Sequence, residues 1–528
     1  MYVIKLPLVV NDYARRRLEI RFKQAGCSLY NAVLGECLKR MRKYKELKKP
    51  ADELYKIGKK DEAKLIYSQA IKDSGFYFRS ADAKHGLNDS INQFSAQMCK
   101  SCWIHHHIGS KVCYTLSERA FEAVKKIVIG TKQKDVQYRK KSKRVNFKRT
   151  KNGLDSLVGI GDRGQTKEIM WKPKHIMRKN GNKTIISNCV VWKKVVLPVI
   201  LDESDELVRR FIEDKPVVKT VLIRRKRVGK RISYWAHLSF DGSPVVKTKN
   251  RCGVGVVGVD LGPNKIAVFT PTKIEYISFE SLEHYAEKIK KIQRTLSRLQ
   301  RLHNPNNFHP NFINKRGKKS LGKVKKGRLS WVVSKRQQKL YDDVADLSRR
   351  KAELRRDLHG KVANTIRSMG DKLHIEQNHI KKWQQDKKLS KLVTRYAPAS
   401  LVTFLTQKFG IENTLFLNTY ATTLSQICPN CLKKQKKPLG ERVHECDCGC
   451  VLDRDITSAF LAYCCTDENT LQESRVQQLY KEYGIFLEAS CNTIQPVLDR
   501  RSKVGCGLPQ KDNECHNLVT WEIEKSAA

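Results

Sequence analysis

The chain has 528 residues, of which 104 are Lys or Arg and 53 are Asp or Glu, so its formal net charge is +51 with neutral histidines. A compact protein with this charge repels itself, which indicates a polyanionic partner, with nucleic acid as the default, and a salt-dependent affinity. A hydrophobic fraction of 40% is enough for real cores and excludes wholesale disorder, and the length predicts about three or four domains.

Neither a membrane span nor a secretory signal is predicted. No apolar run approaches the ~18 residues that cross a bilayer, and the first residues, MYVIKLPLVV, lack the long apolar stretch and cleavage site of a signal peptide. We therefore expect a cytoplasmic protein with no membrane partner. Its 17 cysteines should be reduced thiols or metal ligands rather than a disulfide framework.

The first half of the chain predicts a helical domain between β-rich segments. Residues 1–10 begin with a short strand in which Val, Ile and Leu recur. Residues 11–131 carry apolar side chains at three- and four-residue spacing, as at Tyr30 and Leu34, which is typical of helices. Residues 132–250 change to short β-rich pieces separated by polar turns, so a second, mostly β domain is expected there.

A third domain is predicted over residues 251–427. It opens with an apolar strand, GVGVVGVD, followed by a turn and a second strand. Within residues 282–369, two long segments keep apolar side chains at three- and four-residue spacing and predict antiparallel helices. Residues 303–334 between them are rich in Asn, Pro, Gly and Lys, which predicts an exposed basic loop. Residues 466–528 form a tail to which we assign no function.

Residues 428–450 have the spacing of a zinc site. Two pairs of cysteines, C-P-N-C and C-D-C, flank a basic spacer, and two such turns can complete a tetrahedron of thiolates with Zn–S bonds near ~2.3 Å. The expected ligands are Cys428, Cys431, Cys446 and Cys448. His444 and Cys450 stand close enough to substitute for one of them. Four protein ligands leave no open position, so the role of the ion is structural.

A weaker metal candidate consists of Cys99, Cys102 and His106, which fall on one face of a predicted helix. Apolar neighbours on the same face favour buried core thiols instead.

Three acidic residues occur at the ends of predicted elements. Asp260 ends an apolar strand, Glu376 ends a short strand, and Asp455 directly precedes an apolar helix. Taken singly, they could be a turn residue, a solvated strand end and a helix N-cap. Parallel-type sheets collect functional groups where strands end and helices begin, so the three carboxylates are expected to converge. Asp453 is the rival to Asp455, which is preferred because it lies next to the helix.

Three converging carboxylates repel one another unless divalent cations bridge them. Two Mg²⁺ ions held ~3.5 to 4 Å apart would activate a water and stabilise the leaving 3′ oxygen of a phosphodiester. The acids therefore predict metal-dependent hydrolysis of nucleic acid, with Asp260, Glu376 and Asp455 as magnesium ligands.

Four segments together resemble the transposon-encoded TnpB nucleases and their relatives, the small type V CRISPR effectors. They are GVDLGPNKIAVFT around Asp260, HIEQNHIKKWQ around Glu376, LSQICPNCLKKQKKPLGERVHECDCG, and DRDITSAFLA around Asp455. Their order and spacing are specific as a set. The resemblance extends to the amino-terminal segment and to the Trp-containing stretch KGRLSWVVSKR, and it covers residues 1 to about 465.

The resemblance implies a multidomain α+β protein with a helical recognition lobe, a β-rich wedge domain and a ribonuclease-H-like (RuvC) α/β nuclease domain. The nuclease domain carries an inserted helical hairpin and a zinc-ribbon-like insertion. The implied parts are 1–10, the first wedge strand; 11–131, the recognition domain; 132–250, the wedge domain; 251–427, the nuclease domain with its hairpin at 282–369; 428–450, the zinc-binding insertion; 451–465, the last RuvC motif; and 466–528, the tail. Many members have Asn two residues after the last acid, where this chain has Thr457 and Ser458.

The resemblance also implies a channel for a guide RNA paired with DNA, which such proteins read through A-form backbone geometry. The candidate channel residues are Lys140, Lys141, Lys143, Arg144, Lys148, Arg149, Arg224, Arg225, Lys226 and Arg227. Tyr138 and Phe147 interleave with the first run, where a base could stack.

The expected function is RNA-guided cleavage of target DNA next to a short flanking motif, in a single RuvC site. Its cofactors would be two Mg²⁺, one Zn²⁺ and the guide RNA, and its partners the guide RNA and double-stranded target DNA. The protein would be a monomer or dimer in the prokaryotic cytoplasm, associated with the nucleoid through DNA. Two alternatives stay open: a guided DNA-binding protein without cleavage, serving transcriptional or transposon regulation, and an unguided nuclease of the same fold.

Overall fold

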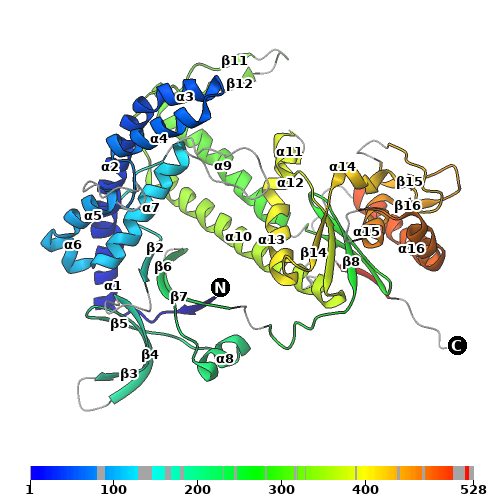
Figure 1. Cartoon of the computed structure of the whole chain (residues 1–528), viewed down its shortest axis with the longest axis horizontal. Helices are drawn as coiled ribbons and strands as arrows, with labels where there is room; N and C mark the ends of the chain where they lie inside the picture. Colours follow the sequence, from blue (N-terminus) through cyan, green and yellow to red (C-terminus); the bar gives the residue numbers. More distant parts are fainter. Residues whose placement is uncertain are drawn as a thin grey trace. The chain divides into compact units, whose positions relative to one another are not determined.

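The computed structural model of the chain consists of two compact units, Met1–Lys247 and Thr248–Ala528 (Figure 1). The residues that the structure describes are 2–79, 90–128, 145–160, 168–178, 184–229, 231–242, 246–279, 282–313, 317, 319–327, 329–386, 389–436, 441–466, 470–503 and 518–522. Within these residues, no helix combines the length and the apolar composition that a membrane crossing requires.

Helices form the first half of the first unit. The Asn11 side chain accepts a hydrogen bond from the Ala14 main-chain N–H (2.8 Å) and so caps α1 (Asp12–Glu19). This helix continues through a π-helical stretch, η1 (Ile20–Ala25), into α2 (Gly26–Leu47). The other helices of this half are α3 (Lys49–Lys56), α4 (Lys60–Ser74), α5 (Ile91–Cys99), α6 (Cys102–His107) and α7 (Ser110–Val128).

Two antiparallel sheets follow. The larger has the strand order β1-β7-β6-β2. Its strands are β1 (Tyr2–Pro7), β2 (Ser156–Ile160), β6 (Thr220–Val228) and β7 (Arg231–Phe240). The smaller sheet consists of β3 (Ile169–Arg178), β4 (Thr184–Trp192) and β5 (Val195–Pro198), and α8 (Glu206–Asp214) follows it. Helices and strands share one hydrophobic core that includes Phe22, Trp192 and Phe240.

A polar network joins the first helix to the larger sheet. The Glu19 carboxylate accepts hydrogen bonds from Arg225 Nε (2.6 Å) and Nη2 (3.1 Å) of β6 and from the Tyr234 hydroxyl (2.5 Å) of β7. Lys23 pairs with the same carboxylate at 2.6 Å. Although burial raises it, the hydrogen bonds from Arg225, Lys23 and Tyr234 lower the pKa of Glu19 to about 2. The ionised carboxylate therefore stabilises this unit.

The second unit is built on a six-stranded mixed sheet with the order β14-β13-β8-β9-β10-β17. Its strands are β8 (Val256–Leu261), β9 (Lys265–Thr270), β10 (Lys273–Ser278), β13 (Lys372–Glu376), β14 (Thr414–Leu417) and β17 (Leu518–Glu522). Strands β8, β13 and β14 are parallel, whereas β9, β10 and β17 alternate in direction. The carboxyl ends of β8 and β13 therefore lie next to each other.

Helices cover both faces of this sheet. On one face, α15 (Arg454–Cys464) packs on β8 and β9, and Phe460 meets Phe269 with ring centroids 5.0 Å apart. On the other face, Val259 shares a core with α10 (Lys335–Met369) and α13 (Pro398–Phe409). Because side chains alternate along a strand, the buried residues of the sheet divide between two hydrophobic clusters.

Two helices and a folded connection form the predicted hairpin. α9 (Glu283–His303) packs along α10 (Figure 1), and Asn304 at its end bonds to Val332 just before α10, so the helices are antiparallel. The connection contains a 3-10 turn (Pro305–Asn307) and the strands β11 (Phe312–Ile313) and β12 (Lys319–Ser320). The expected loop thus contains regular structure.

The remaining elements are α11 (Ile380–Gln385), α12 (Leu389–Tyr396), α14 (Thr419–Thr422), a 3-10 turn (Leu424–Gln426), β15 (Val443–Glu445) and β16 (Val451–Asp453).

The carboxy-terminal segment contains elements that the sequence analysis did not assign. α16 (Glu473–Lys503) packs on α15, with Val476 and Leu487 fully buried, and β17 pairs with β10 at the edge of the sheet. The three- and four-residue spacing of Val476, Tyr480, Tyr483 and Leu487 was a helical signal in this segment.

We predict that Glu19→Gln lowers the free energy of unfolding of the full-length protein by about 1–3 kcal/mol near neutral pH, because it removes charged hydrogen bonds to Arg225 and Tyr234. The pKa of Glu19 lies below its ordinary value of 4.5, so the stabilisation is present above that value and is lost as the pH falls toward about 2. Urea unfolding across this range should show the wild-type advantage shrinking with acidification.

Asp61→Asn is the control, because the Asp61 side chain is 92% exposed and pairs with exposed Lys64. It should change stability little. An advantage of wild type over Glu19→Gln that stays constant down to the lowest pH would contradict this assignment.

Candidate active site and metal centre

The sheet register brings Asp260 and Glu376 together. Parallel β8 and β13 pair Val259 with Ile375, so the next residue on each strand is one of the two acids. Successive side chains on a strand point to opposite faces, so both acids point away from the face that buries Val259 and Ile375. They therefore face the side of the sheet on which α15 lies.

The helix α15 approaches this face because Gly258 has no side chain. A Cβ atom at Gly258 would lie 2.1 Å from the Ala459 carbonyl oxygen, a distance that real Cβ atoms do not reach. On the neighbouring strand, His374 Nδ1 lies 3.1 Å from the Ala462 carbonyl oxygen. The middle of α15 is thus fixed over Gly258 and His374, two residues before the acids. Its amino terminus, with Asp455, extends toward Asp260.

Asp453 rather than Asp455 caps the helix. Asp453 Oδ1 accepts hydrogen bonds from the main-chain N–H groups of Asp455 (2.9 Å) and Ile456 (3.0 Å). The capping role leaves the Asp455 carboxylate available in the first turn. Thr457 and Ser458 are buried, and their hydroxyls bond to carbonyls of the preceding turn.

The three acids interact electrostatically. Burial, followed by the charges of Asp455 and Glu376, raises the pKa of Asp260 well above its ordinary value. Burial also raises the pKa of Glu376 to about 7, against the opposite effect of a hydrogen bond from the Leu424 main chain. Within the described part of the chain, however, no three acidic or histidine ligand atoms lie within 4.8 Å of one another.

Four polar side chains that the sequence analysis missed surround Asp455. Lys265 Nζ lies 3.3 Å from Asp455 Oδ2, and the Tyr276 hydroxyl donates to the same oxygen at 3.1 Å. The Lys265 ammonium also lies 4.5 Å from the centre of the Tyr276 ring. Arg442 and Arg454 approach Asp455 Oδ1 at 3.3 and 3.7 Å. Lys265 and Tyr276 lie on β9 and β10, and Arg442 lies just before β15, so their contact with Asp455 gives no linear signal, whereas Arg454 is its neighbour in the chain.

The four predicted cysteine ligands come together. Cys428 and Cys448 have their sulfurs 3.6 Å apart, those of Cys431 and Cys446 are 3.5 Å apart, and all four lie within 4.8 Å of one another. A tetrahedron with Zn–S bonds near 2.3 Å has sulfurs about 3.8 Å apart. The four thiols can therefore hold a zinc ion.

Tight turns place these sulfurs. The Leu432 N–H donates to the Cys428 carbonyl, and the Gly449 N–H donates to the Cys446 carbonyl, each at 2.9 Å. Although burial acts in the opposite direction, hydrogen bonds from the Cys450 main chain and the neighbouring thiols lower the pKa of Cys448 to about 7. A thiol that ionises near neutral pH is a ready metal ligand.

The two substitute ligands do not join the cluster of four thiols. Cys450 is buried, and its sulfur contacts the Tyr480 hydroxyl at 3.5 Å. His444 is buried in β15.

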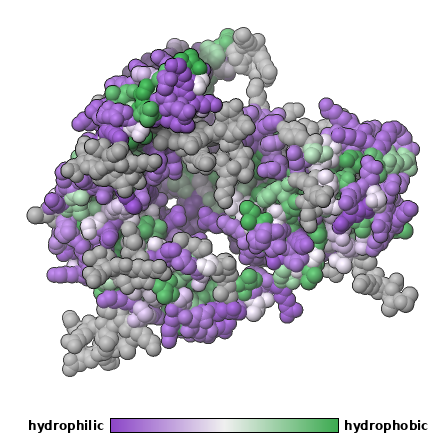
Figure 2. Space-filling model, in the orientation of Figure 1, coloured by the Kyte–Doolittle hydropathy of each residue, from purple (hydrophilic) through white to green (hydrophobic). Residues whose placement is uncertain are grey.

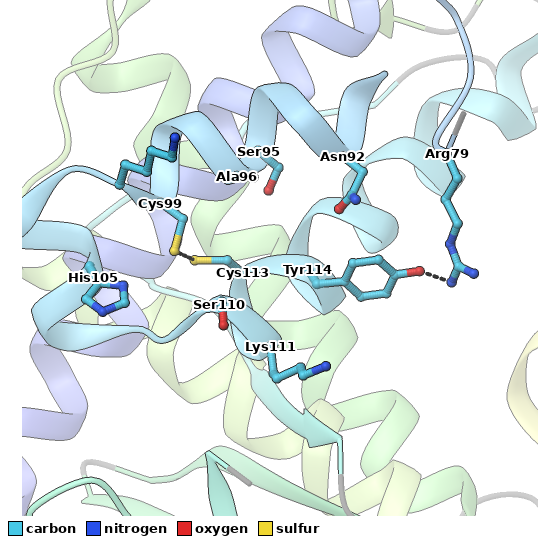
Figure 3. A pocket seen from close by; sticks show the side chains of 11 residues that line it. Arg79, Asn92, Ser95, Ala96, Cys99, His105, Ser110, Lys111, Cys113 and Tyr114 are labelled. Carbon is cyan, nitrogen blue, oxygen red and sulfur yellow. Dashed lines mark hydrogen bonds between the residues drawn. The ribbon is translucent and has the colours of Figure 1, made fainter. Parts of the chain in front are cut away.

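At the weaker metal candidate, the structure shows a buried pair of thiols. Cys99 Sγ lies 2.7 Å from Cys113 Sγ, and both side chains are buried (Figure 3). They line a cavity of about 710 Å³ together with His105, Lys111 and Tyr114. Among the described residues, only the four cysteines of residues 428–448 form a metal-like group. The side chain of Cys102 lies outside the described residues.

The predicted nucleic-acid contacts differ in their surroundings. Arg149, Arg224 and Arg227 are exposed on the first unit, and hydrophilic residues (purple) cover more of the coloured surface in Figure 2 than hydrophobic ones do. Lys148 is held through its main chain by Asn31, with two hydrogen bonds of 2.8 Å. Lys226 is half-buried. The residues Lys140, Lys141, Lys143 and Arg144 lie outside the described part of the chain.

Arg225 has a partner within the chain. Its side chain is 12% exposed and forms the bidentate pair with Glu19. This geometry assigns Arg225 to the internal network of the unit, whereas Arg149, Arg224 and Arg227 are exposed.

The chain is similar to solved structures. No protein-family model and no curated protein matches the chain. The structure aligns with that of a Cas12f1-sgRNA-target DNA complex over 85% of this chain and 82% of the other, with 12% identity and a TM-score of 0.44. It aligns with a CRISPR-Cas12f ternary complex over 85% of this chain and 81% of the other, with 13% identity and a TM-score of 0.27.

We predict that Cys446→Ser removes zinc from the purified protein and loosens the segment around β15 and β16, because structural zinc supplies folding free energy. Metal analysis of the wild type should give one zinc per chain. Cys450→Ser is the matched control and should retain the zinc. Loss of zinc in Cys450→Ser, or no zinc in the wild type, would rule out this ligand set.

Proposed function

We propose that this protein is an RNA-guided DNA endonuclease that hydrolyses target DNA next to a short flanking motif. The observation that carries the proposal is the approach of three carboxylates, Asp260, Glu376 and Asp455, from two parallel strand ends and one helix start. The order of these acids along the chain and the cysteine cluster before the last one support the same assignment.

The donor set fits divalent cations. Carboxylate oxygens are the ligands that Mg²⁺ prefers. Burial and then the charges of Asp455 and Glu376 raise the pKa of Asp260, and the repulsion among these charges is relieved when a cation binds. Magnesium at such a site supplies an activated water and stabilises the leaving oxygen of the phosphodiester. Asp260, Glu376 and Asp455 are the residues that would hold it.

Residues around Asp455 orient the site. The Tyr276 hydroxyl holds Asp455 Oδ2 and Arg442 holds Oδ1. The Lys265 ammonium also pairs with Oδ2, at the oxygen that a cation would use. The Arg442 side chain is 43% exposed, so it is also accessible to a backbone phosphate of bound DNA. These contacts fix the direction of the last carboxylate before any substrate arrives.

Guidance is supported by charge. A net charge of +51 is compatible with a long polyanion, and a guide RNA paired to DNA is held through its backbone while base pairing supplies specificity. Exposed Arg149, Arg224 and Arg227 of the first unit are candidates for such contacts.

We predict that Asp260→Asn and Glu376→Gln abolish cleavage of a supercoiled plasmid in Mg²⁺ while guide-dependent binding persists, because both variants remove a ligand charge at nearly constant volume. The test uses the protein with the RNA that copurifies with it. Sequencing that RNA gives the matching plasmid target. Wild-type cleavage by either variant would contradict the site.

The same assay separates the alternatives. A wild-type protein that shifts the plasmid without nicking or linearising it is a guided binder. Sequence-specific cutting that survives RNase treatment indicates an unguided nuclease.

We predict that Lys265→Met strengthens divalent metal binding. The Lys265 ammonium competes with a cation for Asp455 Oδ2, so its removal should lower the Kd for Mn²⁺ by roughly fivefold, about 1 kcal/mol. Titration calorimetry with Mn²⁺ measures this without any cleavage.

Lys273→Met is the matched control, since Lys273 pairs with Glu275 at 2.8 Å on β10 rather than with Asp455. It should leave the Mn²⁺ affinity unchanged. Weaker Mn²⁺ binding by Lys265→Met would mean that Lys265 positions Asp455 rather than competing for it.

A further inference from the structure

The connection between α9 and α10 presents an apolar surface. We call the described residues of this connection, 302–313, 317, 319–327 and 329–333, the hairpin tip. It includes the KGRLSWVVSKR stretch up to its second valine, to which neither the carboxylate site nor the cysteine cluster gives a role.

Specific hydrogen bonds fix the hairpin tip. Asn304 Oδ1 accepts from the Val332 N–H (2.7 Å), and Asn304 Nδ2 donates to the Val332 carbonyl (3.0 Å). The Arg301 guanidinium donates to the Gly322 carbonyl at 2.9 Å. Gly322 itself packs so closely that a Cβ there would lie 1.7 Å from the His309 carbonyl oxygen. The surface around these residues is therefore held in one shape before any partner binds.

The hairpin tip exposes many large apolar side chains. Val332 is 64% exposed and Trp331 is 40% exposed. The other exposed members are Leu302, Phe312, Ile313, Leu321, Val324 and Val333. A concentration of this kind on one segment marks an interaction surface rather than scattered surface residues.

The ring of Phe308 packs against the exposed Trp331. Phe308 meets Trp331 edge to face, with ring centroids 5.8 Å apart and planes at 84°. The Arg301 guanidinium lies 4.3 Å from the centre of the Phe308 ring. Trp331 is thus supported by Phe308 and still presents indole surface to solvent.

Charge identifies the partner. The sequence has no Asp or Glu between Glu287 and Asp342, whereas the same interval holds 17 Lys and Arg residues. A second copy of the chain would repel this surface, because each copy carries +51. A partner that is anionic and also offers flat apolar faces is single-stranded nucleic acid, whose bases stack on aromatic side chains while its phosphates meet lysines.

We propose that the hairpin tip binds unpaired nucleotides by stacking a base on Trp331, with Lys325 and Lys326 meeting the adjacent phosphates. This inference rests on the proposed RNA-guided function and deepens it, because it names the site that takes an unpaired part of the nucleic acid. RNA and DNA share the chemistry, and the experiment distinguishes them.

The test uses full-length protein and a single-stranded probe of about 12 nucleotides carrying one 5-bromouridine, made as RNA and as DNA. Photocrosslinking followed by mass spectrometry should place the adduct on the peptide that contains Trp331. Trp331→Ala should raise the Kd by about 5- to 100-fold and leave the slope of log Kd against log salt unchanged. The tighter-binding probe identifies the nucleic acid.

Companion variants separate stacking from charge. Trp331→Tyr keeps an aromatic face and should restore most of the affinity. Replacing Lys325 and Lys326 by Gln should flatten the salt slope by about 0.7 for each phosphate that the protein no longer neutralises. Trp103→Ala is the matched control, because Trp103 is 45% exposed on α6 of the first unit. Each variant should unfold at the wild-type temperature.

Several outcomes overturn the inference. Wild-type affinity in Trp331→Ala, or adducts confined to other peptides, removes the stacking site but leaves the proposed function intact. A wild type that binds neither of the two probes nor its copurified RNA overturns the proposed function as well. A Trp331→Ala variant that changes only the oligomeric state, or only binding to anionic vesicles, assigns the surface to a second copy or to a membrane.

Discussion

The close approach of α15 to the sheet is the constraint on which the second unit depends. Gly258 allows the Ala459 main chain to lie where a side chain would otherwise be. Because strand side chains alternate, the residue two positions beyond this glycine points to the same face, and that residue is Asp260. The parallel register of β13 then places Glu376 beside it. One glycine and one strand register thus bring like charges together despite their repulsion.

The sequence analysis could predict Asp260, Glu376 and the four cysteines as site residues because their signals are local: a strand end or a short cysteine spacing. It missed Lys265 and Tyr276, because their contact with Asp455 arises from the pairing of β9 with β10 and the packing of α15 against the sheet, which no linear pattern encodes. It also missed β17, whose pairing with β10 joins segments far apart in the chain.

Net charge indicates a polyanionic partner but does not say which Lys and Arg side chains can contact that partner. Arg225 belongs to a basic run, yet Glu19 engages it inside the first unit, together with Tyr234. The hairpin tip shows the reverse case, in which a segment without acids also carries exposed apolar side chains. Such a segment gains from base stacking as well as from phosphate contacts, so salt weakens its binding less than that of a purely basic surface.

The carboxylates of the candidate active site are not equivalent. Asp455 is surrounded by Lys265, Arg442 and Arg454, so much of its charge is compensated by the chain itself. Asp260 and Glu376 are more deeply affected by burial, which raises the pKa of each. A cation bound near Asp260 and Glu376 would relieve their repulsion, whereas one bound near Asp455 would first have to displace Lys265. Under the proposed function, two cations would therefore be held unequally, with the weaker one on the side of the helix.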